Sequence, residues 1–147
     1  MNNPSVFDLI KRLTDSLPLD PAKVGEALGT RLEPNPAGDT PVLVAYTQAA
    51  GVNSSYRDVN LRLPHPLFGT GAGILSVTFK SDGGVNAKAI WDHYGYDFQT
   101  DVPSPRYPPE TPVYYNYEQP WGTLSLGVTN DAAAKLVSFV MKPKKLG

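Results

Sequence analysis

Apolar residues recur at helical spacing near the start of the chain, where they alternate with charged and polar ones. Ser5 and Asp8, at the start of this segment, form an acidic variant of a helix-capping pattern. The pattern predicts an amphipathic helix over residues 5–17, ending before Pro18. The residues that share its apolar face are Val6, Leu9, Ile10, Leu13 and Leu17.

Two further segments carry helix start and stop signals. Asp20 and Pro21 suit the first positions of a helix and Gly29 suits a left-handed cap, which predicts a helix over residues 21–28. Residues 86–94 repeat this order, with Asn86 as the cap and Gly95 as the stop. Alternation of apolar residues there also fits a strand, so helix and strand both stay open, and the repeated order favours helix.

The remaining apolar residues alternate with polar ones, as in strands that are buried on one face. In residues 40–48 this places Val42, Val44 and Tyr46 inward. In residues 111–119 it places Val113, Tyr115 and Tyr117 inward. Further strands are predicted in the segments 56–64, 73–79, 122–128 and 136–142. The expected fold is α+β, with two or three short helices packed on an antiparallel sheet of about six strands.

Residues 40–48 and 111–119 share Thr, Pro, Val, Tyr and Gln at matching places. Gly-x-Leu-Ser occurs at Gly73 and again at Gly122, in the same order after each Thr-Pro-Val stretch. We therefore expect one domain over residues 1–147 with an internal duplication, its halves spanning 19–84 and 85–142. The alternative is that these matches arise by chance, or from the residue pattern that is common to any helix followed by a hairpin.

This order of helix, glycine, loop and strands resembles the β-lactamase-inhibitor-protein and outer-membrane assembly lipoprotein (BamE-like) folds. The residues that carry the resemblance are an Asp-x-x-x-Val-x-x-x-Leu-Gly helix at Asp20 to Gly29 and a Leu-Ser-Val-x-Phe-x-x-Asp-Gly hairpin at Leu75 to Gly83. The resemblance implies an architecture of helices on an antiparallel sheet, and it carries over no functional residue.

Composition narrows the classes of function. With 13 Lys and Arg against 14 Asp and Glu, the formal net charge is −1, so we expect neither nucleic acid nor an anionic membrane as partner. The absence of cysteine excludes thiol catalysis, thiolate metal sites and disulfides. The start of the chain has no basic, apolar leader, which predicts a cytoplasmic protein, or a periplasmic one if a signal was removed.

Catalytic chemistry has few candidates. The only histidines are His65, between two prolines, and His93, on the polar side of the predicted third helix. The carboxylates are scattered singly, so we expect no metal site, and no motif indicates a cofactor. A small hydrolase that uses loop carboxylates with His65 or His93 remains one alternative function.

Aromatic residues concentrate between Trp91 and Trp121 among many prolines, and such residues are common in recognition surfaces. The leading hypothesis is a non-enzymatic protein-binding module, inhibitor or immunity-like, that uses an aromatic, proline-rich loop and an open sheet face. An envelope-associated structural protein is a further alternative. The residues expected to contact the partner are Tyr96, Tyr107, Tyr114, Asn116, Glu118 and Trp121.

Overall fold

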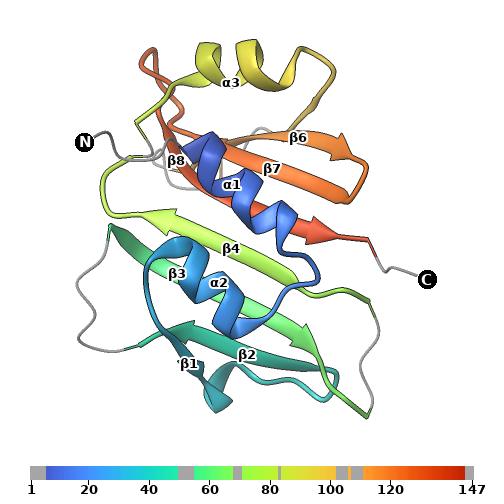
Figure 1. The fold of residues 1–147 in the computed structure, drawn as a ribbon. Helices are drawn as coiled ribbons and strands as arrows, with labels where there is room; N and C mark the ends of the chain where they lie inside the picture. Colours follow the sequence, from blue (N-terminus) through green and yellow to red (C-terminus); the bar gives the residue numbers. More distant parts are fainter. Residues whose placement is uncertain are drawn as a thin grey trace.

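A computed structural model describes residues 6–49, 55–67, 71–82, 84–101, 106 and 111–144. It contains three α-helices and one eight-stranded antiparallel sheet, which confirms the α+β class (Figure 1). The helices are α1 (Val6–Asp15), α2 (Pro21–Leu28) and α3 (Ala87–Tyr94), and a short 3-10 turn, η1, spans Pro36–Gly38. The strands are β1 (Leu32–Pro34), β2 (Leu43–Gln48), β3 (Tyr56–Pro64), β4 (Ile74–Phe79), β5 (Gln99–Asp101), β6 (Val113–Gln119), β7 (Gly122–Val128) and β8 (Leu136–Pro143).

The expected number of about six strands is wrong, because two short edge strands were missed. β1 and β5 have three residues each and lie in the loops that follow α2 and α3. They are too short to show alternation, and only their pairing with β2 and β6 makes them strands.

The strand order is β1-β2-β3-β4-β8-β7-β6-β5, so β4 and β8 meet in the middle of the sheet. Strands at equal distance from this junction are β4 and β8, β3 and β7, β2 and β6, and β1 and β5. The Thr-Pro-Val match joins β2 to β6, which hold such equivalent places. The Gly-x-Leu-Ser match joins β4 to β7, which do not, so the internal duplication stays a proposal.

Local capping signals position α2 and α3 as expected, whereas Ser5, the expected cap of the first helix, lies outside the described residues. Asp20 Oδ1 accepts hydrogen bonds from the N–H groups of Ala22 (2.9 Å) and Lys23 (3.1 Å), and Gly29 caps α2 in the left-handed region with φ +71°. The segment whose class stayed open is a helix, in which Asn86 Oδ1 accepts from the Ala89 N–H at 3.0 Å. Gly95 ends α3 with φ +96° and ψ −171°, a different conformation from that of Gly29.

All three helices contact the same face of the sheet. The Tyr56 hydroxyl on β3 donates to the Leu28 carbonyl at the end of α2, and Trp91 and Tyr94 of α3 contact Tyr115 and Tyr117 of β6. One continuous hydrophobic core lies between helices and sheet, and α1 crosses its middle (Figure 1). No described α-helix covers the opposite face, which we call the open face.

Two residues at or beside β2 differ from expectation in their burial. Val42, expected inward, precedes the strand and is 48% exposed. Ala45, expected outward, is 3% exposed, because the turn at η1 folds over it. Asp39 Oδ1 accepts from the Ala45 N–H at 2.8 Å, and the Asn35 N–H donates to the Ala45 carbonyl at 2.9 Å.

Candidate functional site

The residues expected to contact a partner fall on two sides of the molecule. Tyr115 and Tyr117 of β6 face the helices, so alternation places Tyr114, Asn116 and Glu118 on the open face. The other predicted residues lie elsewhere: Tyr96 is 71% exposed just after α3, Trp121 sits in the turn between β6 and β7 on the helix side, and Tyr107 lies outside the described residues.

On the open face, the Asn116 side chain on β6 forms hydrogen bonds with side chains of both neighbouring strands, β5 and β7. Its Nδ2 donates to Asp101 Oδ2 on β5 at 2.9 Å, and its Oδ1 accepts from Ser125 Oγ on β7 at 2.6 Å. Two residues along β6, Glu118 Oε1 accepts from Thr123 Oγ1 at 3.1 Å. Because each of these side chains is fixed by a cross-strand partner, the polar groups on this part of the sheet are held in place.

Tyr114 lies across its neighbouring strand. Its hydroxyl is 3.3 Å from Ser138 Oγ on β8, and either oxygen can be the donor. Strand β7 lies between β6 and β8. Its residue Gly127 is opposite Tyr114 of β6 on one side and opposite Ser138 of β8 on the other. A Cβ atom at Gly127 would lie 2.8 Å from Tyr114 Cε1 and 2.5 Å from Ser138 Oγ. The missing side chain therefore gives the Tyr114 ring its space.

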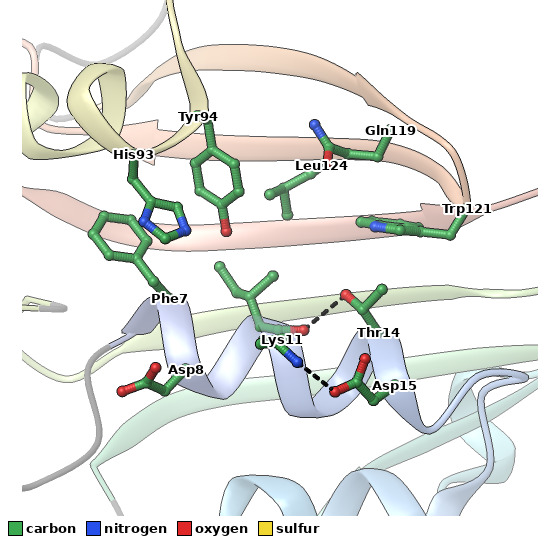
Figure 2. A pocket seen from close by; sticks show the side chains of 11 residues that line it. Phe7, Asp8, Lys11, Thr14, Asp15, His93, Tyr94, Gln119, Trp121 and Leu124 are labelled. Carbon is green, nitrogen blue, oxygen red and sulfur yellow. Dashed lines mark hydrogen bonds and ion pairs between the residues drawn. The ribbon is translucent and has the colours of Figure 1, made fainter.

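On the helix side, Trp121 lines a hollow of about 280 Å³ between α1 and the β6–β7 hairpin (Figure 2). His93 stacks on Phe7 with ring centroids 4.2 Å apart, and Tyr94 meets the same Phe7 edge-on at 5.6 Å. The Tyr94 hydroxyl points into the hollow (Figure 2). Burial, with a smaller contribution from Tyr117, raises the pKa of Tyr94 to about 12, so this hydroxyl stays a neutral group.

In the described part of the chain, the two histidines make a local turn interaction and aromatic ring contacts. His65 Nδ1 accepts the Leu67 N–H at 3.1 Å, a local turn interaction. His93 makes ring contacts, and within the described part of the chain no hydrogen bond joins it to a carboxylate. The described residues also contain no group of three His, Asp or Glu side chains that could hold a metal ion.

Sequence reasoning missed the partners of the predicted open-face residues. Asp101, Ser125, Gly127 and Ser138 complete the contacts of Asn116 and Tyr114. Ser125 and Ser138 are polar residues that the fold buries, at 7% and 4% exposure. Both serines alternate with apolar residues in β7 and β8, and this alternation indicates that they point outward. Alternation does not indicate which side chain of a neighbouring strand each serine contacts.

No protein-family model, curated protein or solved structure matches this chain. Function must therefore be inferred from the geometry. None of the described helices has the length and apolar character that crossing a membrane requires.

Proposed function

We propose that this chain is a non-enzymatic protein-binding module, inhibitor or immunity-like, whose open face on β5 to β8 contacts the partner. The observation that carries the proposal is the set of polar side chains on this face that are fixed by one another, centred on Asn116 and Tyr114. A surface whose side chains are already ordered loses little conformational entropy when it binds.

The nature of the face favours a protein over other partners. Tyrosine, asparagine and hydroxyl side chains provide contact area and hydrogen bonds without a strong charge, as in many protein-recognition surfaces. A nucleic-acid site would need a basic surface, and the net charge of the chain is −1. The proposal includes the exposed Tyr96 as the start of the aromatic, proline-rich loop, and it places the protein in the cytoplasm or, after signal removal, the periplasm.

The test begins with capture of partners from native lysate by the immobilised full chain, followed by binding measurements with each purified partner. The informative variant is Glu118→Lys, because Glu118 is exposed on the open face. Glu26→Lys is the matched control, since Glu26 is exposed on α2 and the charge change is the same. We expect Glu118→Lys to weaken binding by roughly tenfold and Glu26→Lys to leave it unchanged.

Equal affinity of both variants for every purified partner would overturn the use of the open face. Turnover of a small substrate by the purified chain, lost on His93→Ala or His65→Ala, would instead support the hydrolase alternative. Circular dichroism of all variants verifies that the fold is intact.

A further inference from the structure

The Tyr114 ring is held over the sheet from two directions. Its hydroxyl meets Ser138 on β8, and the space it occupies over β7 exists because residue 127 is glycine. Gly127 and Ser138 are both buried, whereas Tyr114 is partly exposed. Its hydroxyl is therefore already engaged by Ser138, and what the ring can offer a partner is its aromatic surface.

One carboxylate lies next to Tyr114, on the side of β6 away from β7. Asp101 of β5 is the residue directly opposite Tyr114, it is exposed, and Asn116 fixes its carboxylate at 2.9 Å. Glu118 lies on the same face of β6 and is also exposed. Lys142, also exposed, lies in the same row of the sheet as Glu118, opposite Thr123 and two strands away. An aromatic ring with a carboxylate beside it complements a basic side chain.

We propose that Tyr114 is the anchor of the open face and that it receives an arginine or lysine side chain presented by the protein partner. Asp101, oriented by Asn116, pairs with the charge of that side chain. Gly127 and Ser138 are positioning residues, which act only by holding the ring over β7. This inference rests on the proposed function, because it assigns the chemistry of the same face.

The ring position can be tested without any partner. In the full chain labelled with ¹³C at tyrosine, the Tyr114 ring signals should shift in Gly127→Ala, because the added methyl group displaces the ring. Ser138→Ala adds no bulk and removes only the hydroxyl partner, so it should shift the same signals with the fold unchanged. Signals that stay in place in both variants would overturn the positioning role.

The chemistry of the site is tested with a defined probe, acetyl-tetraarginine amide, at low salt, with acetyl-tetraglutamate amide as the control. The arginine peptide should shift the signals of Tyr114 and Asp101, and the glutamate peptide should not. Tyr114→Leu should weaken arginine-peptide binding about three- to tenfold, the range of a cation–π contact. Tyr114→Phe keeps the aromatic surface and should retain most of the binding, whereas Gly127→Ala should lose it although the tyrosine is present.

Equal binding of the arginine peptide to the wild type and to Tyr114→Leu would show general charge attraction and overturn the inference. This failure is distinct from failure of the proposed function. A purified partner that is sensitive to Glu118→Lys but insensitive to Tyr114→Leu would leave the open face as the interface and remove Tyr114 as its anchor.

Discussion

At the scale of single residues, the buried tyrosines show how a polar atom is accommodated in this core. Tyr117 is 1% exposed, and its hydroxyl donates to the Gly95 carbonyl at 2.9 Å. The sequence places Tyr117 inward by alternation, whereas the partner of its hydroxyl depends on how α3 ends over β6. Burial, followed by the neighbouring Tyr115 and Tyr96, raises its pKa to about 12.

This raised pKa predicts a loss of stability at alkaline pH. The folded state holds the proton to higher pH than the unfolded state, whose tyrosine titrates near 10.0. The stabilisation is therefore complete below pH 10 and is lost as the pH rises from 10 towards 12. We expect Tyr117→Phe to make this alkaline decline shallower and to lower the free energy of unfolding at pH 7 by about 1 kcal/mol through the lost hydrogen bond.

Urea unfolding at a series of pH values measures both effects. Tyr96→Phe serves as the control, because Tyr96 is 71% exposed and its substitution should change the stability at pH 7 by less than about 0.5 kcal/mol. An alkaline decline as steep in Tyr117→Phe as in the wild type would contradict the assignment.

At the scale of elements, the two glycines of the Gly-x-Leu-Ser match are explained by the same local packing. A Cβ at Gly73, before β4, would lie 2.7 Å from the Arg62 carbonyl oxygen on β3. A Cβ at Gly122, at the start of β7, would overlap the Lys142 carbonyl oxygen on β8. Each glycine therefore allows a neighbouring strand to approach closely, although β4 and β7 hold different places in the sheet.

This close approach predicts different costs for two similar substitutions. Gly73 and Gly29 both have positive φ, at +83° and +71°, but no atom lies within 4 Å of a Cβ built at Gly29. We expect Gly29→Ala to cost about 1–2 kcal/mol through backbone conformation alone. Gly73→Ala should cost about 1–3 kcal/mol more, because the β3 backbone must move. Chemical denaturation gives both values, and equal losses would refute the steric reason.

At the scale of the whole molecule, the core crosses the junction between β4 and β8. Val77 of β4 lies opposite Phe139 of β8, and Leu75 lies opposite Met141. These four side chains are 0% exposed and belong to the same hydrophobic cluster as buried residues of all three helices. A core shared in this way couples the two ends of the sheet.

Phe139→Ala should therefore destabilise the chain as one cooperative unit, by about 3–5 kcal/mol for a buried phenylalanine. Trp91 and Trp121 both lie in the second half of the chain, so tryptophan fluorescence reports that half, and far-UV circular dichroism reports the whole. The two urea transitions should coincide in the wild type and shift together in the variant. Phe139→Leu is the milder variant if the alanine form does not fold, and separated transitions would argue for independently folding halves.

The sequence by itself determined the elements whose causes are local. Asp20, Pro21 and Gly29 define α2 because their hydrogen bonds and backbone angles lie within a few residues of one another. The α+β class likewise follows from apolar periodicity, which records the side of each element that faces the core. Residues 86–94 could not be decided locally, since two periodicities fit the same short segment.

Only the tertiary structure decided what depends on pairing between distant segments. The edge strands β1 and β5, and the burial of Ala45 under η1, arise from such contacts. The strand residues of the predicted partner-contact set lie on the open face, whereas Trp121 lies on the helix side, because alternation assigns a face within one strand but not the position of a hairpin turn. The contact of Tyr114 with Gly127 and Ser138 needs the register of three strands, which no single segment encodes.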